Sequence, residues 1–213
     1  MATLLLSNPP EIEGAKYPDF ERWLQRNQYD RICCYCVLSN KVLEIEHYIP
    51  KSFDSSREHD PLNLLLACAT CNRGKWDYHP DHEARRKQSK ATHGFMALDP
   101  RSDDYASLIR VQVDDGVLVP LDGVEKERAA WHIGLTLLDL PKRNTDRKNL
   151  LRLHRAAEKI VAKNEVDPEV VEVLLNDFAR SILFYELWGV PVSDTLRADA
   201  LGRRRELLAK EQP

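Results

Sequence analysis

The 213-residue sequence contains no apolar run close to the roughly 20 residues that a membrane-spanning helix needs. Its first residues also lack the basic segment and the small-residue cleavage site of a secretory signal, so we expect a cytoplasmic protein. Positive charge is not in excess either, because the formal net charge is −3. This balance argues against binding nucleic acid through bulk electrostatics, so any such contact must come from local basic patches.

Cysteine is scarce, but the five cysteines are not scattered. Four of them form two Cys-x-x-Cys pairs, Cys33 with Cys36 and Cys68 with Cys71, and Cys34 is left over. Thiols inside a cell stay reduced, so such pairs favour metal binding or redox chemistry over disulfides. Two pairs in tandem favour a closed structural zinc site with four thiolate ligands. Ordinary buried thiols, or one redox pair, are the alternative.

Between the cysteine pairs, Glu46 and His47 end an extended run that Pro50 stops. Phosphodiester hydrolysis needs a base to deprotonate water and a cation to stabilise the developing negative charge. The imidazole of His47 can serve as that base near neutral pH. Glu46 and Asn72 offer hard oxygen ligands that suit Mg²⁺ or Mn²⁺. The alternative is a solvated Glu-His pair at a strand end.

Basic residues near this segment are candidates for holding phosphates. Lys51, Arg73 and Lys75 lie close to it in the sequence and can act as point charges on the substrate. The segment from Lys142 to Lys163 contains eight basic and two acidic residues, which favours a nucleic-acid or partner surface. For both groups, a solvated helix face or strand end is the alternative.

The stretch from Cys33 to Lys75 resembles the zinc-bearing branch of the HNH, or ββα-metal, endonucleases. Glu46 and His47 match the first position of the motif, Asn63 the middle one and Asn72 the last. The resemblance implies His47 as general base and Asn63 as the brace of the loop that bears it. It also implies Glu46 and Asn72 as ligands of a catalytic divalent cation. Two positions depart from the commoner pattern, because Glu46 replaces Asp and Asn72 replaces the final His.

A looser resemblance involves Ile45–His47, Pro50–Ser52, Asn63–Leu66, Cys71–Asn72 and Leu98–Pro100. These segments are similar to the HNH nuclease subunit of the Septu and retron-linked anti-phage systems. That likeness implies an antiviral defence role and an ATPase partner of the ABC type. The helical tail would then serve as a docking surface.

The expected fold class is α+β, with a zinc-stapled ββα module, a β-hairpin and a mainly helical C-terminal region. Expected strands cover 42–48 and 62–67, a helix follows to 75, and a hairpin spans 108–121. Apolar periodicity predicts helices over 125–138, 144–163, 168–188 and 194–210. We expect three parts: an N-terminal arm and short helix (1–30), the nuclease module (31–95), and the hairpin with the helical region (96–213).

Two functions follow from these observations. The first is a metal-dependent endonuclease that cleaves DNA, with Zn²⁺ as a structural staple and Mg²⁺ or Mn²⁺ at the catalytic site. The second is a zinc-stabilised adaptor that binds nucleic acid or protein without turnover. The sequence leaves RNA open as a substrate.

Overall fold

The computed structural model describes residues 9–10, 14–27, 32–38, 42–81, 96–161 and 168–210. Parts of the predicted N-terminal arm and the predicted boundary near residue 95 therefore lie outside the described residues. Within them the fold is α+β, which confirms the predicted class.

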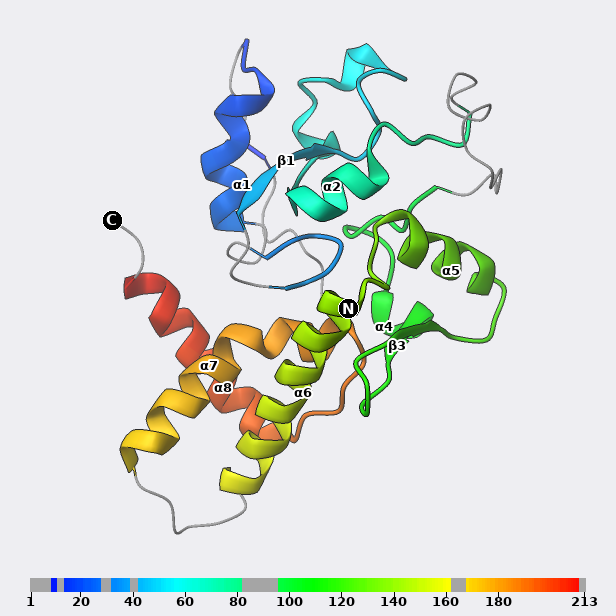
Figure 1. Cartoon of the computed structure of the whole chain (residues 1–213). Coiled ribbons are helices and arrows are strands. Elements are labelled where there is room, and N and C mark those ends of the chain that lie inside the picture. The colour runs from blue at the N-terminus through cyan, green and yellow to red at the C-terminus, as the bar shows by residue number, and fades with distance from the viewer. Residues whose placement is uncertain are drawn as a thin grey trace.

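The first sheet and the helix after it form a strand, strand, helix unit. A 3₁₀ helix, η1 (Tyr17–Phe20), leads into α1 (Glu21–Asn27). Strand β1 (Leu43–His47) then pairs antiparallel with β2 (Leu64–Cys68), and α2 (Ala69–Lys75) follows β2 without a loop. The unit places the end of β1 beside α2 (Figure 1).

Strand β2 is buried along its whole length, and its alternation divides its side chains between two cores. Leu64 and Leu66 pack with the α1 side of the sheet, in a cluster with Phe20 and Leu24. Residues on the other face of β2 belong to the main core, which also contains all five cysteines. The first sheet therefore packs against α1 on one face and against the main core on the other.

The predicted hairpin is confirmed. After a short helix, α4 (Tyr105–Leu108), strand β3 (Ile109–Val111) pairs antiparallel with β4 (Leu118–Pro120). Gly116 lies in the connecting turn with a φ of 75°, a conformation that favours glycine. The carbonyl of Gly116 accepts a 2.6 Å hydrogen bond from Nε of Arg147, so the turn rests on the helical region.

Four longer helices complete the chain: α5 (Lys126–Leu135), α6 (Pro141–Val161), α7 (Pro168–Leu187) and α8 (Asp194–Lys210). The helix predicted to start at residue 144 begins three residues earlier, with Pro141 as the first residue of α6. Proline suits this position because the first helical N–H has no partner within the helix. Helices α6, α7 and α8 gather at the end of the molecule opposite the first sheet (Figure 1).

A single main core runs from Ile32, through the cysteines, to Ala200. The module predicted over 31–95 and the helical region therefore share buried surface within the described residues, and the three-part division stays a prediction. None of the described helices combines the length and the apolar composition that a membrane crossing requires.

His132 lies within this core, between residues that are far apart in the sequence. The ring of His132, on α5, is fully buried between Tyr35 and Tyr105, at centroid distances of 5.8 and 5.4 Å. Its Nδ1 accepts a 3.1 Å hydrogen bond from the backbone N–H of Leu98. Burial, with a smaller contribution from Arg128, lowers the pKa of His132 to about 3. The ring is therefore neutral in the folded protein at physiological pH.

We expect His132 to make the fold acid-sensitive. Its pKa is near 6.5 in the unfolded chain and about 3 in the folded one, so the unfolded chain binds the extra proton. Stability should therefore fall by about 1 kcal/mol per pH unit as the pH drops below 6.5. Urea unfolding of zinc-loaded protein at several pH values measures this slope. His132→Asn, which keeps an acceptor for Leu98, should flatten it, and an unchanged slope would contradict the assignment.

Candidate functional site

The cysteines of the two Cys-x-x-Cys pairs converge on one point. The Sγ atoms of Cys33, Cys36, Cys68 and Cys71 all lie within 4.8 Å of one another, and all four residues are buried. A tetrahedral zinc with bonds of about 2.3 Å separates its sulfur ligands by about 3.8 Å, so the cluster fits that ion with little adjustment. Cys34 is buried as well, but it is not part of the cluster. This arrangement supports zinc binding by the four predicted residues.

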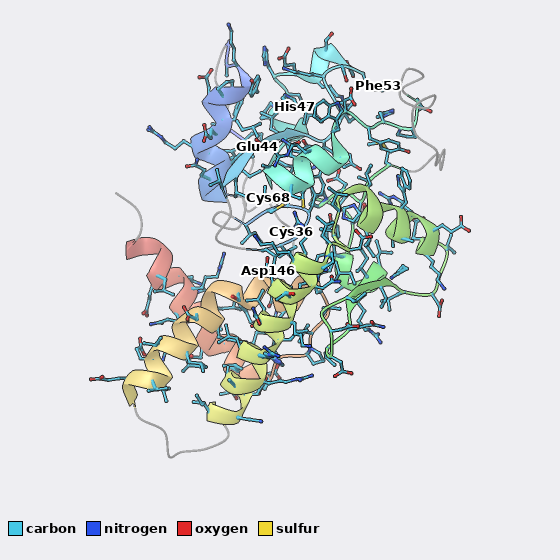
Figure 2. The ribbon with its side chains drawn as sticks, viewed as in Figure 1. Cys36, Glu44, His47, Phe53, Cys68 and Asp146 are labelled. Carbon is cyan, nitrogen blue, oxygen red and sulfur yellow. The ribbon has the colours of Figure 1, made fainter. Side chains whose placement is uncertain are left out.

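The four thiols hydrogen-bond to one another, so negative charge is concentrated on one of them, Cys68. Hydrogen bonds from the other three thiols lower the pKa of Cys68, whereas burial raises the pKa of Cys33 and Cys36. A guanidinium nitrogen of Arg143, from the first turn of α6, lies 3.3 Å from the Cys68 sulfur. The cluster is thus enclosed between the ββα unit and the start of α6, and Figure 2 shows Cys36 and Cys68 there, near Asp146.

Glu46 points into the protein, where two buried groups hold it. The hydroxyl of Tyr35 donates a 3.1 Å hydrogen bond to Oε1, and the amine of Lys75 lies 2.6 Å from the same oxygen. Burial raises the pKa of Glu46, and the charge of Lys75 partly offsets this effect. Both contacts use Oε1, so the second oxygen takes part in neither of them.

Lys75 is 1% exposed, and its amine also donates a 3.0 Å hydrogen bond to the carbonyl of His47. The sequence interpretation of Lys75 as a phosphate contact therefore needs correction. A cation that is enclosed by the fold and bound to Glu46 acts as an internal counter-ion, because it cannot reach a substrate without breaking these bonds.

His47 ends β1 and is held by a backbone carbonyl. Its Nε2 lies 2.9 Å from the oxygen of Glu58, and a carbonyl can only accept, so Nε2 carries the proton. In the neutral ring, Nδ1 then keeps its lone pair. The ring of Tyr17, from η1, meets the His47 ring edge-on at 5.1 Å between centroids. The imidazole is therefore oriented from two sides and can accept a proton at Nδ1.

Asn63 lies in a short 3₁₀ helix, η3 (Pro61–Asn63), and is almost fully buried. Its Oδ1 accepts a 2.7 Å hydrogen bond from the N–H of Ile49, and its Nδ2 donates to the carbonyls of Ile49 and Arg57 at 2.9 and 3.1 Å. These bonds tie the chain just after His47 to the loop that contains Glu58, the partner of the His47 ring.

Asn72 stands on the exposed side of α2. Its Nδ2 donates a 2.9 Å hydrogen bond to Oε1 of Glu44, which is exposed on β1. Because the amide nitrogen is turned to Glu44, the Asn72 oxygen is left for a cation. Glu44 adds a second carboxylate near this point, which the sequence analysis did not single out.

A cleft of about 300 Å³ brings together five of the seven residues predicted for catalysis and phosphate binding. Glu46, His47 and Asn72 line it, and Lys51 and Arg73 stand at its walls. The oxygen donors of this set suit a hard divalent cation. The remaining lining residues are Ile45, Pro50, Ser52, Trp76 and Asp77.

Sequence reasoning missed the residues that position this site. Tyr35 lies between the first two zinc ligands, and its position inside a Cys-x-x-Cys pair was a signal that could have marked it. Tyr17 and Glu58 carried no such signal, because they reach His47 only through the tertiary fold.

The basic segment on α6 is less exposed than its composition indicates. Arg143 and Arg147 are buried, with Arg143 on the cysteine cluster and Arg147 bound to backbone carbonyls. Lys163 lies outside the described residues. Part of the local positive charge therefore holds the fold together, and only the rest can form a surface.

Comparison with known families identifies the segment that contains the site. Residues 33–77 match the family described as HNH endonuclease. No curated protein matches the chain. The matched residues include both cysteine pairs, β1, β2 and α2, so the segment carries an HNH domain, and this supports a nuclease-type function. The narrower likeness to anti-phage nuclease subunits stays a prediction.

Proposed function

We propose that this protein is a metal-dependent endonuclease that hydrolyses phosphodiester bonds in DNA. One observation carries the proposal: within the HNH segment, Glu46, His47 and Asn72 line a single cleft that basic residues border. A zinc ion in the four-cysteine cluster would be purely structural, because four sulfur ligands leave no position for water.

In this mechanism, His47 takes a proton from the attacking water at Nδ1, while the carbonyl of Glu58 holds the protonated Nε2. Asn63 fixes the loop that supplies this carbonyl. Glu46 and Asn72 would hold Mg²⁺ or Mn²⁺, which would stabilise the negative charge on phosphorus and on the leaving oxygen. Lys51 and Arg73 would bind the flanking phosphates.

Replacement of His47 by alanine tests this function. Because the general base is lost, we expect plasmid nicking in Mg²⁺ or Mn²⁺ to slow by at least about 100-fold. Zinc content and thermal unfolding should stay near wild type, since the side chain is only half-buried. His59→Asn is the matched control, because this exposed histidine does not line the cleft, and asparagine keeps an acceptor for the N–H of Tyr17.

Nicking at the wild-type rate by His47→Ala would remove this residue from the mechanism. If the wild-type protein cut in neither metal and still bound DNA tightly, the adaptor function would replace the nuclease.

We further propose that the protein acts in the cytoplasm, in anti-phage defence, with an ATPase partner of the ABC type. The sequence similarity at Ile45–His47, Pro50–Ser52 and Asn63–Leu66 supports this proposal. Affinity purification of the tagged chain from its own host tests it, because such an ATPase should be recovered with the chain.

A further inference from the structure

Trp76 exposes its side chain at the wall of the candidate active cleft. It is 59% exposed and lines the cleft together with His47 and Arg73. The other three tryptophans of the chain are buried or half-buried. Large aromatic side chains stabilise a fold or a complex mainly when they are buried. The exposure of this indole therefore indicates a role in binding.

The backbone at Trp76 makes this position more unusual. Its φ is 52° and its ψ is −136°, and the N–H of Tyr78 bonds to the carbonyl of Lys75 at 3.1 Å. A turn with this conformation at its second residue favours glycine, and a side chain there costs on the order of 1–3 kcal/mol. Packing within the protein explains little of why tryptophan rather than glycine occupies this position, because most of the indole surface is exposed.

The surroundings of the indole indicate the chemistry of its ligand. Arg73, exposed on α2, and Lys51, on the loop after β1, line the same cleft and carry positive charge. Asp77 also lines it and interacts with Ser52 at 3.4 Å, so the charge of the cleft is not uniform. A flat aromatic surface beside cations that can track phosphates is the arrangement by which proteins bind unstacked nucleotides.

We infer that Trp76 stacks on a nucleobase of the nucleic-acid strand that occupies the cleft. This base would be next to the phosphate that is cleaved beside His47. The role of that phosphate rests on the proposed function, but binding of the base does not. A base offers its face to the indole either in a single strand or at a kinked step of a duplex, where an apolar side chain separates neighbouring pairs.

Fluorescence and affinity measurements on zinc-loaded protein, without Mg²⁺ or Mn²⁺, test this inference independently of cleavage. Binding of a short single-stranded oligonucleotide should quench tryptophan fluorescence, and Trp76→Phe should abolish most of that quenching. Trp76→Ala should weaken binding by about 5- to 150-fold. Trp76→Gly, which suits the turn, gives a second variant if alanine impairs folding.

Leu62→Ala is the matched control, because Leu62 is also 59% exposed but does not line the cleft. It should bind as the wild type does. Wild-type affinity in both Trp76→Ala and Trp76→Gly, or full quenching in Trp76→Phe, would overturn the inference.

A duplex of the same sequence distinguishes a base from a single strand from a base at a kinked duplex step. A loss of affinity confined to the single strand would assign Trp76 to unpaired substrates, and an equal loss on the duplex would assign it to a kinked step. If cleavage fails in every metal while binding still depends on Trp76, the stacking site stands and the nuclease proposal falls.

Discussion

Replacement of Cys71 by serine should release zinc and unfold the protein. Zinc bound by four thiolates contributes about 10 kcal/mol or more to the folding of small domains, and natural domains are stable by only about 5–15 kcal/mol. Cys71 is fully buried in the cluster, so its loss leaves three thiols without a complete shell. The measurements are zinc content per chain, far-UV circular dichroism and thermal unfolding.

The loss should extend beyond the ββα unit. The cysteines belong to the same buried cluster as residues of α7 and α8, and Arg143 joins α6 to Cys68. Helical signal should therefore decrease along with zinc. A chelator strong enough to remove zinc from the wild type should reproduce the effect.

Cys34→Ser is the control for this prediction. Cys34 is as buried as the ligands and lies next to one of them, but its sulfur is outside the cluster. The variant should keep one zinc per chain. Release of zinc by Cys34→Ser, with zinc retained by Cys71→Ser, would show that the ligand set is wrong.

The sequence predicted those parts of the fold that depend on local pattern or on spacing. Two cysteine pairs at short spacing indicate a shared metal wherever the chain brings them together. The hairpin around Asp114–Gly116 and the helix that begins at Asp194 follow from turn residues and apolar periodicity alone. The hairpin and the helix need no knowledge of distant contacts, and the structure confirms both. It also brings the four cysteines together, which supports a shared metal.

The parts that the sequence did not predict depend on pairs that are far apart in the chain. Lys75 reads as a surface cation until it is seen to meet Glu46, 29 positions earlier, inside the protein. Arg143 and Arg147 likewise count as surface charge in the sequence, but they contact a sulfur and backbone carbonyls of other segments. The charge of a residue does not predict whether its side of the helix is buried against other segments.

The ion pair between Lys75 and Glu46 leads to the second large effect. We expect Lys75→Met to destabilise the zinc-loaded protein by about 3–5 kcal/mol, because it removes one partner of a buried pair. The Lys75 side chain is 0% exposed and that of Glu46 is 4% exposed, so water cannot take over from the lost amine. Methionine fills a similar volume, and the loss therefore reports charge more than packing.

A double-mutant cycle separates this pairing from other losses. Glu46→Gln keeps the shape of the side chain, can still accept from Tyr35 and removes the unpaired charge. Combined with Lys75→Met, it should restore a large part of the stability lost in the single variant, since no buried charge remains alone. Urea unfolding gives all four free energies. If the two single losses simply add, the residues do not act as a pair.

The same cycle bears on the catalytic site. Lys75 also bonds to the carbonyl of His47, so Lys75→Met frees the end of β1 as well as Glu46. Lys75→Arg keeps a positive charge, but it places a larger side chain at a position with 0% exposure. Relative to Lys75→Met, it should regain less stability than the addition of Glu46→Gln does. If Lys75→Arg is instead more stable than the double variant, the site tolerates a different donor geometry. Charge alone then holds Glu46 in place.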